Sequence, residues 1–163
     1  MKIAAEHIPS RSLSTIIWNF WFTPFSADFR CCRNTLEVDS SPEKSNDGFV
    51  VKGNETIEFL EEKLAILGLN EIEAEEFIVY WLPKLQENEY NYIRFATMDE
   101  INKNMPLEFS VKPDTIIRVL MQYKGLDNYI EVKEQKLETP ERTGFVAVEW
   151  GGTEIKQQNS IIR

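Results

Sequence analysis

Residues 54–88, NETIEFLEEKLAILGLNEIEAEEFIVYWLPKLQEN, decide the fold that we expect for this chain. Apolar residues recur at steps of three and four through both halves of the stretch, which is the spacing of one helix face. In the first half they are Ile57, Leu60, Leu64 and Leu67, and in the second Ala74, Phe77, Ile78, Trp81, Leu82 and Leu85. The link between the halves is short, so the stretch predicts two amphipathic helices packed as a helical hairpin.

Helix start and stop signals lie at the expected places within this hairpin. Asn54 can cap the first helix, and Gly68 can end it in a left-handed conformation. Asn70 can cap the second helix, with Glu73 three residues later as its capping-box partner. Pro83 has no N–H to give to the turn before it, so we expect a kink or an end to the helix there.

The rest of the chain has the alternation of strands rather than the period of helices. Strands are predicted at residues 48–53, 90–97, 107–111, 115–124, 129–133 and 144–150. They follow one another through short links without helical crossovers, so we expect most of them to pair antiparallel. The predicted fold class is α+β, a helical hairpin packed on a mainly antiparallel sheet of about five to six strands.

Changes in composition along the chain divide it into three parts. Residues 1–47 hold an irregular aromatic cluster followed by a polar run at residues 39–47, and we interpret them as an N-terminal arm and linker. Residues 48–154 form the α+β module, and residues 155–163 form a polar tail. We expect this segment to pack as an arm over the module and not to form an independent domain. The alternative is an adhesive extension that has lost its native context.

The charge of the chain argues against two classes of partner. A formal net charge of −9 disfavours binding to nucleic acid and adhesion to anionic membranes, which both depend on lysine and arginine. The aromatic run at residues 15–25 is too short to span a bilayer. Residues 1–14 lack the apolar core of a secretory signal, so the bacterial envelope and the cytoplasm both stay open as locations.

Catalytic and metal-binding constellations are missing from the sequence. His7 is the single histidine and lies in the predicted arm, which argues against triads and multi-histidine metal sites on the module. Cys31 and Cys32 are adjacent and imply neither a disulfide framework nor a metal site. Gly151 and Gly152 follow a strand but lack the rest of a phosphate loop. We therefore predict no catalytic residue, metal or cofactor.

Three tyrosines around the end of the second predicted helix are candidate binding residues. Tyr80 precedes Trp81 on the helix, and Tyr90 and Tyr92 begin the next strand. Such a group can stack on a sugar or a peptide. The alternative is a core role, with Trp81 buried and the tyrosines half exposed at the junction of helix and sheet.

Glu149 is the acid that we single out, together with its neighbour Trp150. It lies between Val148 and Trp150 on a strand that looks buried, and an acid among apolar neighbours can have a raised pKa and do acid–base work. The alternative is that it faces solvent at the strand end or pairs with Arg118 or Arg142.

Residues 48–154 resemble the C-terminal module of an uncharacterised family of bacterial proteins. The segments that carry the resemblance are GFVVKGNETIEFLEEKLAILGLNE, EFIVYWLPKLQENEYNYIRF, KPDTIIRVLMQYKGLD and GFVAVEWGGTEI. That family has no assigned activity, so no catalytic residue carries over. The resemblance implies a larger preceding region that adds strands of its own, and residues 1–47 do not resemble that region.

These observations favour a non-catalytic module for interaction or assembly, which binds a protein partner or domain. One alternative is a carbohydrate- or peptide-binding module that uses the three tyrosines. The other is a glycan hydrolase, which would need two carboxylates roughly 5 to 10 Å apart in one cleft. The sequence leaves catalysis open, although the missing constellations argue against it.

Overall fold

The computed structural model describes four parts of the chain, residues 19–21, 29–30, 47–109 and 111–155. The remainder of the predicted arm 1–47 and of the predicted tail 155–163, including both cysteines and His7, lies outside the described residues. The fold is α+β, as the sequence predicts.

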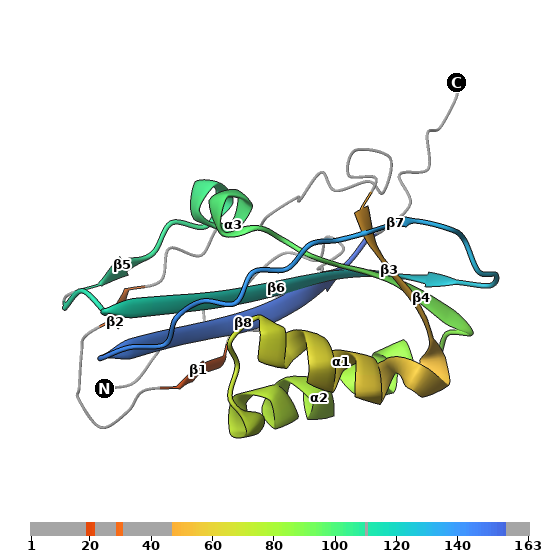
Figure 1. Ribbon diagram of the computed structural model, residues 1–163, viewed down its shortest axis with the longest axis horizontal. Coiled ribbons are helices and arrows are strands. Elements are labelled where there is room, and N and C mark those ends of the chain that lie inside the picture. Colours follow the sequence, from red (N-terminus) through yellow and green to blue (C-terminus); the bar gives the residue numbers. More distant parts are fainter. Residues whose placement is uncertain (1–18, 22–28, 31–46, 110, 156–163) are drawn as a thin grey trace, which may run out of the picture.

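Helices cover both faces of one sheet (Figure 1). The helices α1 (Thr56–Ile66) and α2 (Glu71–Leu85) pack side by side on one face, which we call the helix face. The short helix α3 (Met98–Asn104) lies on the opposite face, which we call the α3 face. The sequence predicted the hairpin on one side, and for the polar residues 98–104 it indicated only a short helical turn or a loop.

The main sheet has six strands in the described part of the chain, in the order β1-β8-β6-β4-β3-β7. Their bounds are β1 Asn19–Trp21, β3 Asp47–Lys52, β4 Tyr90–Phe95, β6 Thr115–Leu126, β7 Lys133–Glu134 and β8 Val146–Glu154. A separate pair joins β2 (Phe29–Arg30) to β5 (Glu108–Phe109). Two short segments of the predicted arm, β1 and β2, therefore pair with strands of the module.

The sheet is mixed in direction. Three pairs are antiparallel, β1 with β8, β3 with β4 and β4 with β6, but β6 runs parallel to β8 and β3 parallel to β7. A parallel pair needs a long connection, and residues 127–145 provide it. This crossover segment runs past β7 and back along the sheet to the start of β8 (Figure 1).

Two predicted strand boundaries are wrong for reasons of tertiary structure. The predicted strand 129–133 is not a strand over most of its length, because β7 begins only at Lys133, where the chain meets β3. The strand predicted to end at Trp150 is also longer than expected, because β8 includes Gly151 and Gly152 and continues to Glu154. A Cβ atom on Gly152 would lie 2.8 Å from the Trp81 ring, so glycine lets α2 pack closely over this strand.

The capping signals of the hairpin are mostly confirmed. Asn70 and Glu73 form the predicted capping box, with hydrogen bonds of 2.8 and 2.9 Å between side chains and backbone. Gly68 has a φ of 90° and ends α1 as predicted. Asn54 is not the first cap, because it lies in a 3-10 turn, Gly53–Glu55, that delays α1 until Thr56. The hydroxyl of Thr56 donates instead to the Lys52 carbonyl at 3.0 Å.

Pro83 does not end the second helix, which continues to Leu85. The core explains this outcome, because Leu85 and Trp81 are buried on the helix face and their packing outweighs one missing backbone hydrogen bond. The core of the helix face consists of side chains from both helices and the central strands, among them Leu60, Leu64, Phe77, Trp81, Leu85, Ile93, Phe95, Ile117, Met121 and Trp150.

Side-chain hydrogen bonds attach the crossover segment to the rest of the module at its middle and near its C-terminal end. The side-chain amide of Gln135 donates to the Phe95 carbonyl at 2.6 Å and accepts from the Phe95 N–H at 2.9 Å. These two hydrogen bonds satisfy the backbone of Phe95 at the end of β4, as a paired residue on a neighbouring strand would. Further on, Arg142 donates two hydrogen bonds to Glu73 at 2.6 and 2.8 Å and one to the Gly68 carbonyl at 2.9 Å.

Candidate functional site

The predicted tyrosines do not form one group, since Tyr80 and Tyr92 lie on opposite sides of the sheet. Tyr92 neighbours Ile93, which points into the helix-face core, so strand alternation puts Tyr92 on the α3 face. It is only 2% exposed, and its hydroxyl donates to the Asp47 carbonyl at 2.8 Å. Tyr92 is thus a core residue with a satisfied hydroxyl.

Tyr80 lies half buried on α2, against the helix-face core. Its ring meets Trp81 edge to face at a centroid distance of 5.0 Å. The ammonium of Lys84 lies 4.5 Å from the Tyr80 ring centroid and 4.6 Å from that of Trp81. A lysine of the chain itself therefore occupies the aromatic surface that a ligand would need.

Tyr90 is half buried, like Tyr80, and its neighbour was not expected. Its ring meets Tyr129 edge to face, with centroids 6.1 Å apart. Tyr129 is 61% exposed and Ile130 is 44% exposed, both on the crossover segment just after β6. The sequence pattern missed them because it placed them in a strand, where alternate side chains would be buried.

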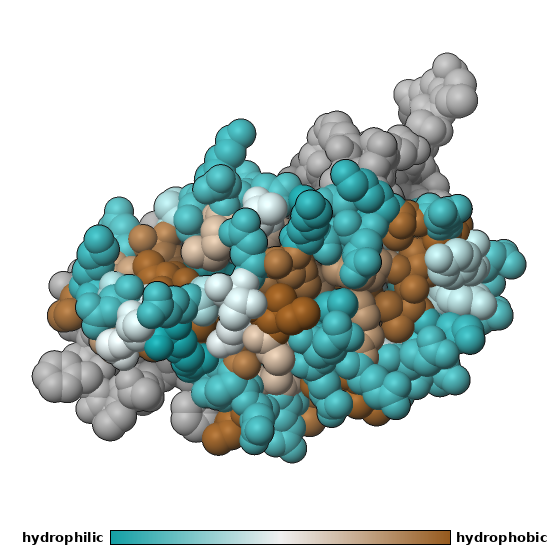
Figure 2. Space-filling view, viewed as in Figure 1, coloured by the Kyte–Doolittle hydropathy of each residue, from teal (hydrophilic) through white to brown (hydrophobic). Residues whose placement is uncertain are grey.

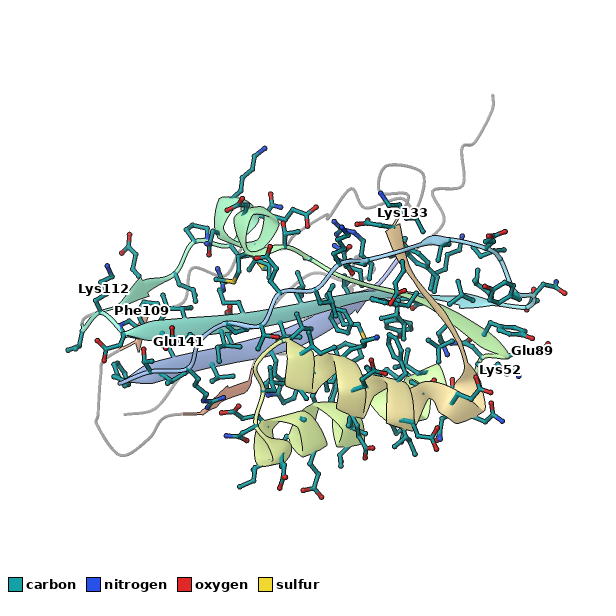
Figure 3. All side chains as sticks on the ribbon, in the orientation of Figure 1. Lys52, Glu89, Phe109, Lys112, Lys133 and Glu141 are labelled. Carbon is teal, nitrogen blue, oxygen red and sulfur yellow. The ribbon has the colours of Figure 1, made fainter. Side chains whose placement is uncertain are left out.

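We define the tip surface as Tyr90, Tyr129 and Ile130 together with the flanking acids Asp127 and Glu131. Both acids are exposed, and Tyr90 pairs in register with Leu126 at the end of β6, so these residues meet at one end of the sheet. Figure 3 labels Lys52 and Glu89 at the same end. Figure 2 shows apolar and weakly polar side chains gathered there within a hydrophilic border.

Trp150 and Glu149 point to opposite faces of β8. Trp150 is buried in the helix-face core and meets the Phe77 ring edge to face at 5.4 Å. Glu149 is on the α3 face and only 4% exposed, and it accepts a hydrogen bond from Arg118 Nε, its register partner on β6. Pairing with Arg118, one of the alternatives that the sequence left open, is what the structure shows.

Burial and ion pairing act on Glu149 in opposite directions. Burial raises the pKa of Glu149 above its usual range, although the hydrogen bond and charge of Arg118 pull it down. A raised pKa is a mark of catalytic acids, but such an acid must also reach its substrate. At 4% exposure and against a guanidinium, Glu149 has no such access in this conformation.

A second arginine completes a polar row on the α3 face. Arg94 donates to both oxygens of Glu100 at 2.9 and 3.0 Å and to Gln122 at 3.2 Å. Arg118 donates to Asn102 at 2.9 Å. Glu100 and Asn102 both belong to α3, so this row holds the short helix on the sheet. The arrangement is that of a structural network rather than of a reaction centre.

Metal and membrane sites receive no support from the described residues. No group of three or more His, Cys, Asp or Glu side chains there is placed to hold a metal ion. No helix there combines the length and apolar character needed to cross a bilayer.

Comparison of the chain with protein-family models, with curated proteins and with solved structures gave no match. The resemblance to a bacterial family therefore stays an expectation.

Proposed function

We propose that this chain is a non-catalytic interaction module that contacts a partner protein through the tip surface. The observation that carries the proposal is the exposure of Tyr129 and Ile130 beside Tyr90. Aromatic and large aliphatic side chains that stay exposed next to one another favour a contact site, since water contact with them is unfavourable. The other predicted site residues are engaged inside the fold.

The contacts of Glu149 support an interaction module over a glycan hydrolase. A hydrolase of that kind needs two carboxylates that reach the substrate from one cleft. Glu149 is bound by Arg118, and Glu100 on the same face is bound by Arg94. Both acids therefore serve the packing of α3 against the sheet.

Site-specific photo-crosslinking tests the proposal. Ile130 is replaced by a photoreactive phenylalanine analogue, and the variant is expressed in the native organism. Ile72 serves as the matched control, because it is also an exposed isoleucine, at 59%, and lies at the start of α2, far from the tip surface. We expect one protein to crosslink at position 130 and not at position 72. The purified pair should then bind at least tenfold more weakly when Tyr129→Ala and Ile130→Ala are combined.

Two results would overturn the proposal. One is the absence of any crosslinked protein specific to position 130. The other is binding of a defined oligosaccharide that the Tyr129→Ala variant abolishes, because that result would assign the tyrosines to sugar recognition instead.

A further inference from the structure

The tip surface lies in an acidic part of the molecule. Besides Asp127 and Glu131, the turn between α2 and β4 contributes Glu87 and Glu89, and all four carboxylates are exposed. Lys52 and the half-buried Lys124 of β6 are also at this end, but the ammonium of Lys52 is paired with Glu55 at 3.3 Å. The aromatic and aliphatic side chains of the tip surface are thus bordered mainly by negative charge.

One of these acids, Glu87, also acts on a buried tyrosine of the helix-face core. Tyr123 lies on β6, three residues before Leu126. Burial, followed by the charges of Glu154 and Glu87, raises the pKa of Tyr123 to about 12. Burial is the main cause of this pKa shift, and the charge of Glu87 adds to it because a nearby negative charge disfavours the phenolate.

Tyrosine rings beside carboxylates suit one kind of ligand group. A guanidinium or ammonium is attracted to the face of an exposed aromatic ring, and carboxylates nearby add charge-assisted hydrogen bonds. The aliphatic stem of arginine or lysine can pack on an isoleucine such as Ile130. The chain already uses this combination internally, where Lys84 lies over Tyr80 and Trp81 and Lys63 lies 5.0 Å from the Phe49 centroid.

The same charges disfavour the other occupants. Two tip surfaces of this chain would repel one another, because each carries two exposed carboxylates with Glu87 and Glu89 beside them, and the whole chain has a net charge of −9. Phosphates of nucleic acid would be repelled for the same reason.

We infer that the tip surface receives a basic segment of its partner, one whose arginine or lysine side chains lie on Tyr90 and Tyr129 between the flanking carboxylates. The inference rests on the proposed function, and it specifies the chemistry of the partner at that surface.

Fluorescence anisotropy with labelled peptides on the full chain tests the inference. The probe is a nine-residue peptide with three arginines and three leucines. The control peptide has the same sequence with glutamine in place of each arginine. We expect only the arginine peptide to bind, at least tenfold more weakly at 300 mM than at 50 mM salt. Asp127→Asn combined with Glu131→Gln, and separately Tyr129→Ala, should each weaken binding at least fivefold.

The control removes the same charge elsewhere. Glu71→Gln combined with Glu75→Gln changes two exposed carboxylates at the start of α2, away from the tip surface, and should leave binding unchanged. Equal binding of the glutamine peptide, no binding of the arginine peptide, or equal weakening by the control pair would overturn the inference. If the peptide experiment gave one of these results but a partner still crosslinked specifically at position 130, the inference would fail and the proposed function would remain supported.

Discussion

At the scale of single residues, the buried pair of Arg118 and Glu149 sets the stability of the α3 face. Arg118→Leu leaves a buried carboxylate without its cation and should lower the free energy of unfolding by about 3–5 kcal/mol. Arg118→Leu combined with Glu149→Leu removes both charges and should recover most of that loss. Urea unfolding at pH 7 measures both variants. A single variant as stable as the wild type would show that the pair is not buried as described.

Gln135 is a second residue whose role lies in its tertiary contacts. Gln135→Leu removes both hydrogen bonds to the Phe95 backbone and should destabilise the fold by about 2–4 kcal/mol, because two buried groups lose their partners. Its exposed neighbour provides the control, since Lys136→Leu should change stability by no more than about 0.5 kcal/mol. Equal effects of the two substitutions in chemical unfolding would contradict this role.

At the scale of elements, Glu73 joins the start of α2 to the crossover segment. Burial would raise the pKa of Glu73, but hydrogen bonds from Arg142 and Asn70 and the charge of Arg142 hold it below 4.5. The carboxylate therefore stabilises the fold fully above about pH 4.5, and this contribution is lost as the pH falls through the lowered pKa.

Glu73→Gln tests this linkage. The variant should be less stable at pH 7 by about 1–2 kcal/mol, since it weakens a cap and an ion pair. Its unfolding free energy should also fall less steeply than that of the wild type below about pH 4.5. Part of the pH dependence should persist in this variant, because Glu100 also has a lowered pKa. Burial would raise the pKa of Glu100, but its contacts with Arg94 and Thr97 lower it. Glu75→Gln, at an exposed position, should keep the full wild-type slope.

At the scale of the whole molecule, β6 is the strand around which the sheet is built. It pairs with β4 on one side and with β8 on the other, and most of its side chains are buried. Amides of β6 should therefore exchange with solvent most slowly, at rates near the global unfolding limit. Amides of the two-residue strand β7 should exchange much faster. Hydrogen exchange read by mass spectrometry checks this order, and uniform protection across the sheet would contradict it.

The tip surface illustrates how far the sequence alone reaches towards a site. Tyr90 is among the predicted site residues because aromatic side chains cluster around it in the sequence. Tyr129 could not be added, because it is distant in the chain and joins Tyr90 only through the pairing of β4 with β6. The sequence also could not show that Tyr80 and Tyr92 pack on opposite faces of the sheet, because that depends on how α2 and β4 are arranged in the fold.

Elements whose signals are local could be predicted from the sequence. The periodicity of apolar residues predicted the two long helices, and alternation located most strands. Residue type and spacing predicted the capping box at Asn70 and the left-handed turn at Gly68. The way these elements combine became clear only in the folded chain. Examples are the parallel pairing of β6 with β8, the extension of β8 through Gly152, and the pairing of Glu149 with Arg118. Local propensity acts over a few residues, whereas strand order and buried ion pairs depend on contacts between residues far apart in the chain.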